Sequence, residues 1–271
     1  MQNQPMQDTF IEKPSSAANE TLEDYTLRYA PYSFRRWSPK VVAITALGGI
    51  AYLADFSIGA SIGMTYGTTN AIFSILFAAL IIFLTGLPLA YYAARYNIDL
   101  DLITRGAGFG YFGSVLTSII FASFTFIFFA LEGSIMAQGL LLGLGIPLWM
   151  GYLISTIMVI PLVIYGMKAL STLQVWTTPI WLILMIGPVA YLIYQEPELV
   201  SQFAAYAGNG GFAAIDVAAI MLGAGICLSL IMQIGEQIDY LRFMPAKTKE
   251  NSKSWWIAVI SAGPGLSLIH I

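Results

Sequence analysis

The chain has 271 residues, of which 58% are hydrophobic and only 10% are charged, with a formal net charge of −3 and a mean hydropathy of +0.74. Soluble globular proteins carry about 25% charged residues, so this composition excludes a soluble domain and predicts an all-α integral membrane protein. The single cysteine, Cys227, excludes a disulfide framework, and the single histidine, His270, lies near the end of the chain. We therefore expect neither histidine-based catalysis nor a metal site, and we do not expect an enzyme.

The N-terminal region is polar and acidic, without the apolar stretch of a cleavable signal peptide. We expect residues 1–22 to form a disordered tail. Residues 23–40 mix aromatic and basic side chains, which predicts an interfacial segment lying on lipid headgroups, with Tyr32 and Trp37 as anchors.

Apolar stretches long enough to cross a bilayer recur along the rest of the chain. A transmembrane helix needs about 20 predominantly apolar residues. Six complete spans are predicted, at residues 41–66, 70–94, 111–143, 148–166, 174–194 and 212–241, and a seventh begins near residue 254.

The distribution of the 12 Lys and Arg residues tests this span count. All of them fall in the N-terminal region or in the connections after spans two, four and six, which lie on one side of the membrane. The other connections, at residues 67–69, 144–147 and 195–211, contain none. The positive-inside rule then predicts a multi-pass protein of the plasma or inner cell membrane with a cytoplasmic N-terminus.

Two of the predicted spans look discontinuous. Span one contains LGGIAYLADFSIGASIGMTYG and span six contains LGAGICLSLIMQIGEQID, so both combine glycines with polar side chains. Glycine-interrupted spans at corresponding positions of two halves are typical of transporters built from inverted repeats. The alternative is that these glycines only allow close packing between helices. The polar residues beside them favour broken helices.

The spacing divides the chain into a first five-span repeat, residues 41–194, and a second unit, residues 212–265, that contains span six and the start of span seven. The last six residues, LSLIHI, look like a translated sequencing adapter, and we expect residues 266–271 to be a non-native tail. The chain is then expected to be the front part of a longer protein.

Four local motifs occur in order along the predicted spans. They are SFRRWSP before span one, DLDLITRGAGFGYFGS before span three, IYGMKALSTLQVWTTP between spans four and five, and DYLRF at the end of span six. Together they resemble the nucleobase:cation symporter family, in its purine–cytosine permease-like branch, over residues 23–265. The Asp-aromatic-x-Arg-aromatic pattern of DYLRF is the most specific of the four.

This resemblance implies the leucine-transporter-type fold, with two inverted five-helix repeats and two further helices. It also implies import of a nucleobase, hydantoin or related heterocycle, coupled to Na⁺ or H⁺, with the substrate held at mid-membrane between spans one, three, six and eight. The expected partners are this heterocycle, the coupling cation and the lipid bilayer, with neither a nucleic acid nor an organic cofactor.

Span three carries the first candidate substrate residues. Thr125, Phe128 and Glu132 share one helix face. By resemblance, Phe128 takes the position of an aromatic residue that stacks on the flat substrate, and Thr125 takes that of an amide that binds it. The family member most comparable here has Trp and Gln at these positions. Phe keeps the aromatic face, but Thr loses two-point amide recognition, which argues against a standard cytosine-like substrate.

Two carboxylates lie inside predicted spans, where a charge costs at least about 2.5 kcal/mol. Glu132 can bind a heterocycle N–H group, carry a coupled proton, or cap the neighbouring broken helix, and the sequence does not choose among these roles. Asp55 lies where span one is expected to unwind. It can satisfy freed backbone N–H groups there, or help to hold a cation or a proton.

The remaining candidates belong to spans one and six. By resemblance, the carbonyls of Gly48 and Tyr52 match part of the family's Na⁺ site, and Leu230 takes the place of a second aromatic residue around the substrate. Gln233 can supply an amide to the substrate, and Glu236 can move protons or steady the break.

Asp239 and Arg242, three residues apart, can pair as a structural clamp at the exit from span six.

The favoured function is a secondary transporter. The alternative is a transporter-like sensor module of a larger signalling protein, which a long soluble extension after the spans would indicate.

Overall fold

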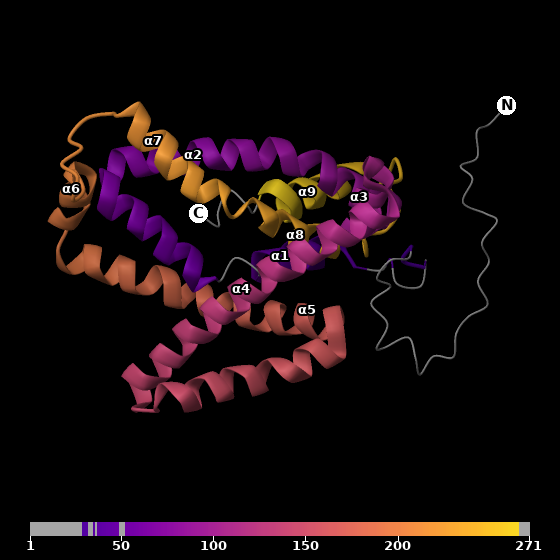
Figure 1. Ribbon diagram of the computed structural model, residues 1–271, viewed down its shortest axis with the longest axis horizontal. Coiled ribbons are helices and arrows are strands. Elements are labelled where there is room, and N and C mark those ends of the chain that lie inside the picture. The colour runs from indigo at the N-terminus through magenta and orange to yellow at the C-terminus, as the bar shows by residue number, and fades with distance from the viewer. Residues whose placement is uncertain (1–28, 32–34, 36, 49–51, 266–271) are drawn as a thin grey trace.

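The computed structural model describes residues 29–31, 35, 37–48 and 52–265, and within them it contains helices and connections but no strand (Figure 1). The elements are α1 (Pro39–Gly48), α2 (Leu53–Tyr96), α3 (Leu100–Thr104), the π-helix η1 (Arg105–Phe109), α4 (Gly110–Leu144), α5 (Leu148–Gln195), α6 (Glu198–Ala205), α7 (Val217–Leu228), the 3₁₀-helix η2 (Ile231–Gln233), α8 (Ile234–Leu241), α9 (Ser252–Ile260) and the π-helix η3 (Ser261–Gly265). The predicted all-α membrane fold is confirmed. The expected tails, residues 1–22 and 266–271, and most of the interfacial segment 23–40 lie outside the described residues.

Five helical stretches are long and apolar enough to cross a membrane, one fewer than the six predicted spans. They are Leu53–Tyr96, Leu100–Leu144, Leu148–Gly166, Ala169–Gln195 and Val217–Leu241. The difference arises because α2 joins the second part of span one to span two. Gly67 interrupts α2 with φ 80° and ψ 162°, and the helix turns back on itself at the end beside α6 (Figure 1). When α2 is counted as two limbs, residues 53–66 and 68–96, the structure has six crossings, the number predicted.

The turn at Gly67 depends on the absence of a side chain. Its φ is positive, and a Cβ atom there would lie 2.7 Å from the carbonyl carbon of Ala207. The chain after α6 presses against this turn, where the backbone N–H of Asn209 donates to the Met64 carbonyl at 2.7 Å and that of Thr68 donates to the Tyr206 carbonyl at 3.0 Å. The loop therefore satisfies backbone groups that the interrupted helix leaves open.

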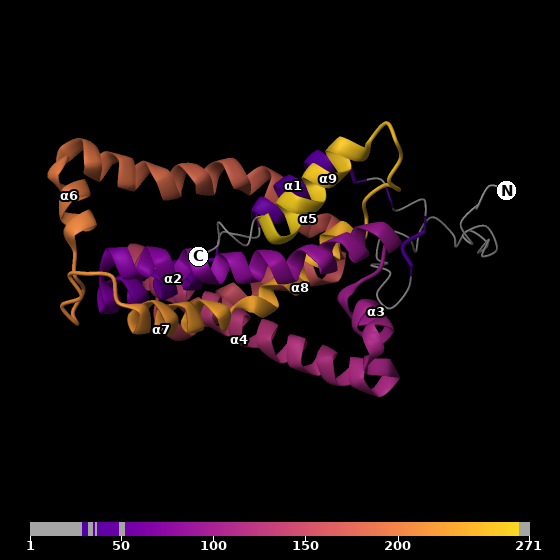
Figure 2. The ribbon, with the colours of Figure 1, turned by 90° about the horizontal axis from the view of Figure 1, so that it is seen from above.

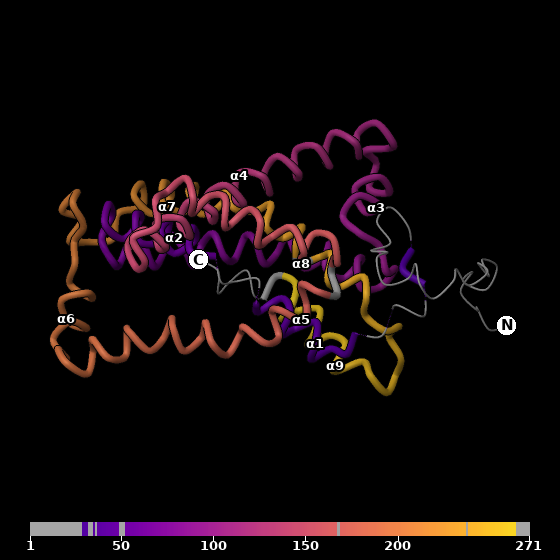
Figure 3. The backbone as a smooth tube through the Cα atoms, turned by 90° about the horizontal axis from the view of Figure 1, so that it is seen from below, coloured from indigo at the N-terminus to yellow at the C-terminus, as the bar shows by residue number. Residues whose placement is uncertain are grey.

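The α5 helix also consists of two limbs. Gly166 has φ 63° and ψ −157°, which are not helical values, and the chain reverses there to give the limbs of predicted spans four and five. Figure 3 shows α5 turning sharply once and returning toward α6. The short helix α6 lies in the connection 195–211, where no helix was predicted.

Both spans that were predicted to be discontinuous are broken. In span one, α1 ends at Gly48 and α2 begins at Leu53, after Tyr52 in an extended conformation with φ −83° and ψ 112°. At about 1.5 Å per residue, α1 and the first limb of α2 together are about 36 Å long, enough to cross a bilayer as two half-helices. In span six, α7 ends at Leu228 and α8 begins at Ile234.

The buried core follows the two broken spans. A larger cluster joins α1, α8 and α9 through Val42, Ile238, Leu241 and Trp255, and a smaller one joins both limbs of α2 to α7. By contrast, α4 and α5 leave large apolar side chains exposed, such as Leu142 at 88%. Because lipid solvates apolar side chains, such exposed surface is expected on a membrane-embedded helix.

The molecule has two distinct ends. Figure 2 places α6 at one end of the long axis, and α3 and the connection between α8 and α9 at the other. Described basic residues lie on or beside the elements of the second end: Arg95, Arg105, Arg242, Lys247, Lys249 and Lys253. The α6 segment carries acidic Glu198 and has no basic residue. The one-sided charge distribution of the sequence thus corresponds to one end of the fold.

Candidate functional site

Side chains from spans one, three and six meet where the two broken helices are interrupted. We call this group of residues the break site. Its members are Tyr52, Asp55, Phe128, Glu132, Gln233 and Glu236. All six were among the residues that the sequence singled out, although they are up to 184 positions apart in the chain.

A buried hydrogen bond links the two breaks directly. The Gln233 amide nitrogen lies 3.2 Å and 3.1 Å from the two carboxylate oxygens of Asp55. Asp55 is in the first turn of α2 and is only 1% exposed, and Gln233 ends the short turn η2 of span six. A buried carboxylate is stable only when hydrogen-bonded or paired, so this contact fixes the two interrupted segments to each other.

Tyr52 makes a second link between the broken spans and adds span three. Its hydroxyl donates to Oε2 of Glu236 at 2.8 Å. Its ring meets the Phe128 ring edge-on with centroids 6.4 Å apart, and Phe128 in turn packs against Phe124 at 4.6 Å. Phe128 is buried. One aromatic surface therefore runs from span three to the extended residue at the break of span one.

Glu132 lies one turn after Phe128 on α4 and contacts the start of α2. Its Oε1 accepts a hydrogen bond from the backbone N–H of Ala54 at 2.8 Å. The first N–H groups of a helix have no partner within the helix, so a carboxylate from another span takes the capping role here. This geometry matches the helix-cap role that the sequence left open beside two others.

The charged side chains of the break site are all acidic. Asp55, Glu132 and Glu236 come from three different spans, and the helical segments that carry them, residues 53–66, 110–144 and 217–241, contain no Lys, Arg or His. Carboxyl groups in a medium of low dielectric are stabilised by hydrogen bonds, by a basic partner, or by a bound cation or proton. The arrangement can therefore attract positive charge to mid-membrane.

Three other predicted site residues, Thr125, Leu230 and Gly48, take no part in the links described above. The Thr125 hydroxyl donates to the Ala122 carbonyl of its own helix at 2.8 Å. Leu230 is buried between α7 and η2. Gly48 ends α1 against the second limb of α5, where a Cβ atom would lie 2.5 Å from Cβ of Gln174. Close packing between span one and span five thus depends on this glycine.

The family model for permeases for cytosine/purines, uracil, thiamine and allantoin matches residues 29–271. The chain belongs to this permease family. No match is found among curated proteins or among solved structures. Membership confirms the family resemblance and indicates a multi-pass membrane transporter rather than an enzyme.

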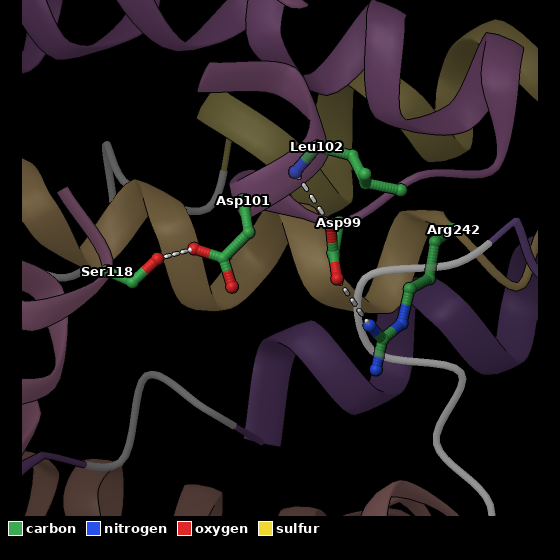
Figure 4. A network of polar contacts seen from close by, with 5 residues as sticks. All are labelled: Asp99, Asp101, Leu102, Ser118 and Arg242. Carbon is green, nitrogen blue, oxygen red and sulfur yellow. Dashed lines mark hydrogen bonds and ion pairs between the residues drawn. The ribbon is translucent and has the colours of Figure 1, made fainter. Parts of the chain in front are cut away.

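The exit motif of this permease differs from its predicted arrangement. Nη1 of Arg242 lies 3.7 Å from Oδ2 of Asp99, and both side chains are buried, whereas the expected partner was Asp239 (Figure 4). Within the described part of the chain, Oδ1 of Asp239 has no hydrogen-bond partner. The ion pair of Arg242 therefore joins span six to the connection between spans two and three, and not to Asp239 as predicted.

The reason for the different pairing lies in the turn between α2 and α3. Asn97 adopts a left-handed conformation with φ 55°, and its side-chain nitrogen donates to the carbonyls of Arg242 and Met244, each at 2.8 Å. These bonds hold the chain after α8 against the turn and bring the guanidinium to Asp99. The other carboxylate oxygen of Asp99 caps α3 by accepting from Leu102 N–H at 2.9 Å.

Two residues of this clamp, Asn97 and Asp99, were not singled out from the sequence. A local signal existed for both, because Asn at a helix C-terminus and Asp just before a helix are common caps. Their contact with Arg242, more than 140 positions away, has no local signal. The Ser118 hydroxyl extends the network by donating to Asp101, which ties α4 to α3 (Figure 4).

Proposed function

We propose that the chain is part of a secondary active transporter that imports a nucleobase or a related small heterocycle, of the cytosine, purine, allantoin or hydantoin class, coupled to Na⁺ or H⁺. The observation that carries the proposal is the meeting of two broken helices at a group of polar and aromatic side chains, in a chain of the permease family. Half-helices that meet at mid-membrane are the usual setting of a transporter's substrate site.

The substrate would lie against span three. Phe128 would stack on a planar ring, Thr125 and Leu230 would border it, and Gln233 would offer an amide to its edge. The contact of Phe128 with Tyr52 supports this placement, because it puts the aromatic face beside the unwound segment of span one.

The coupling ion would be attracted by the carboxylates of the break. Asp55 and Glu236 would carry charge or protons, and the carbonyls of Gly48 and Tyr52 would contribute oxygen ligands of the kind that Na⁺ accepts. The grouping of three carboxylates from different spans at the break supports a cation there. No organic cofactor is required by this scheme.

The proposal includes an orientation. We place the protein in the plasma or inner cell membrane with a cytoplasmic N-terminus, and the α3 end of the molecule on the cytoplasmic side, because the basic residues gather there. The division into two inverted repeats, the first at residues 41–194, also remains part of the proposal.

Uptake by the full-length protein tests the proposed function. In proteoliposomes, a panel of radiolabelled nucleobases, allantoin and hydantoins is offered with imposed Na⁺ or pH gradients. We expect at least one heterocycle to accumulate, and to lose accumulation when the gradient is removed. Binding of a heterocycle without accumulation would favour the alternative of a sensor module. Neither uptake nor binding across the panel would refute the proposed function.

A further inference from the structure

We propose that Glu132 is a specificity-determining residue that excludes anionic heterocycles from the site. The argument rests on the proposed function, since it concerns which members of that substrate class are accepted. Its central observation is that a carboxylate of the protein itself already occupies the start of the half-helix, residues 53–66, that borders the proposed substrate position.

The start of a helix is normally a place where anions bind. Its first backbone N–H groups lack intrahelical partners, and the helix dipole adds partial positive charge. In a broken transmembrane helix these groups can face an anionic group of the substrate. Here the N–H of Ala54 instead donates to Oε1 of Glu132, at 2.8 Å, across from span three.

The surroundings of this contact place it at the substrate position. Glu132 follows Phe128 by one helical turn on the same face of α4. Phe128 contacts the ring of Tyr52, which directly precedes the half-helix. A planar ligand stacked on Phe128 would therefore lie beside the Ala54 N–H group, and a carboxylate on that ligand would compete with Glu132 for it.

Two further carboxylates strengthen the exclusion of anionic ligands. Asp55 follows Ala54 in the first turn of the half-helix, and Glu236 binds the hydroxyl of Tyr52. Both carboxylates add negative charge beside the start of the half-helix. The site is thus suited to neutral or positively charged heterocycles, and a carboxylated ring would meet both an occupied donor and repulsion.

The test compares matched ligands that differ by one carboxylate. Binding to the purified full-length protein is measured for uracil and orotate, cytosine and 5-carboxycytosine, and hydantoin and hydantoin-5-acetate. For the wild type, the neutral member should bind and its carboxylated partner should bind at least about tenfold more weakly, as expected for a helix-terminus interaction of up to about 2 kcal/mol. Glu132→Ala should reduce this ratio about tenfold.

A second variant separates the effect of the Glu132 charge from that of its hydrogen bond with Ala54 N–H, and it also controls for misfolding. Glu132→Gln keeps an oxygen that can accept from Ala54 N–H but removes the charge, so its ratio should fall between those of the wild type and Glu132→Ala. Glu198→Gln, on α6 at the far end of the molecule, is the matched control and should leave the ratio unchanged.

The outcomes are distinct. A neutral ligand that binds with an unchanged ratio in both Glu132 variants overturns the proposal and leaves the proposed function intact. Loss of all binding by stable variants would make Glu132 a direct ligand of the ring, and loss of the fold in both variants would make its role structural, so either result also overturns it. Failure of every neutral heterocycle to bind the wild type would remove the proposed function and this inference together.

Discussion

Tyr52 touches three spans although it belongs to no helix. Its backbone is extended at the break of span one, its hydroxyl reaches Glu236 of span six, and its ring reaches Phe128 of span three. The hydroxyl and the ring thus serve different neighbours. Removing only the hydroxyl should therefore separate the role of the carboxylate from that of the aromatic surface.

We expect Tyr52→Phe to change ion coupling more than substrate affinity. A hydrogen bond to a charged group contributes about 1.5–3 kcal/mol, so its loss should shift the Na⁺ or H⁺ concentration for half-maximal uptake by about tenfold or more. The ring contact with Phe128 remains, and the apparent affinity for substrate should change less than about threefold. Uptake measured over a series of cation concentrations decides the point.

The matched control for this variant is Tyr191→Phe. The Tyr191 hydroxyl also has a hydrogen bond, from Gln195 at 2.8 Å, but it lies exposed near the end of α5. Its loss should leave the cation dependence unchanged. An equal shift in both variants, or a change confined to substrate affinity in Tyr52→Phe, would contradict a coupling role for the Tyr52–Glu236 pair.

At this scale the sequence singled out residues that the fold brings together, but it did not identify their partners. Asp55, Glu132 and Gln233 stood out because polar side chains in apolar spans are costly, and all three lie at the break site. Which groups they contact depends on how three spans cross, and a single sequence does not specify this. The sequence therefore leaves three roles open for Glu132, and its contact with Ala54 N–H favours the helix-cap role.

Among the elements, the clamp at the end of α8 gives the clearest prediction. Breaking a buried ion pair by removing one partner costs about 3–5 kcal/mol, so Arg242→Ala should lower the thermal stability of the protein in detergent strongly. Asp99→Asn should cost less, because Asn also caps helices and keeps the acceptor for Leu102 N–H. Asp239→Asn should cost less than Asp99→Asn, because the ion pair of Arg242 is with Asp99 and an Asn oxygen can still accept a backbone hydrogen bond.

The three variants together test the corrected pairing. If Asp239→Asn destabilised the protein as much as Asp99→Asn, the ion pair within the DYLRF motif would be restored as the clamp. Thermal unfolding of each variant at equal detergent and lipid concentrations supplies the comparison.

The turn within α2 yields a second prediction about an element. Gly67→Ala would place a non-glycine residue in a conformation that costs about 1–3 kcal/mol, and its Cβ atom would collide with the backbone of Ala207. We expect a marked loss of thermal stability and of packing between α2 and the loop after α6. Gly63→Ala, four residues earlier, meets no atom within 4 Å and should be neutral or slightly stabilising.

The elements that the sequence predicted well have strong local signals. Glycines beside polar residues marked both broken spans, and the apolar stretches gave the limbs of α4 and α5. The short helix α6 was missed because eight residues are too few for a periodic pattern to distinguish a helix from a loop. The turn at Gly67 is stabilised by a loop about 140 positions later, so no local pattern distinguishes it from an ordinary kink.

At the scale of the whole molecule, the two ends differ in charge and in construction. The α3 end combines the buried clamp with Lys and Arg residues in the surrounding connections. The α6 end is held by backbone hydrogen bonds between the loop and the turn of α2. Because the translocation machinery retains basic segments on the cytoplasmic side, the α3 end is expected to face the cytoplasm.

Labelling of introduced cysteines tests this orientation. Cys227, the one cysteine of this sequence, is fully buried, and it is replaced by Ala together with any further cysteine of the full-length protein to give a cysteine-free background. Ser201→Cys lies on exposed α6, and Thr248→Cys lies in the exposed connection between α8 and α9. In intact cells, a membrane-impermeant maleimide should label the first variant and spare the second, which should react only after the membrane is permeabilised. The reverse pattern would place the N-terminus outside. Labelling of both positions in sealed cells would contradict the predicted span count, because the single crossing by span six must put the two sites on opposite sides of the membrane.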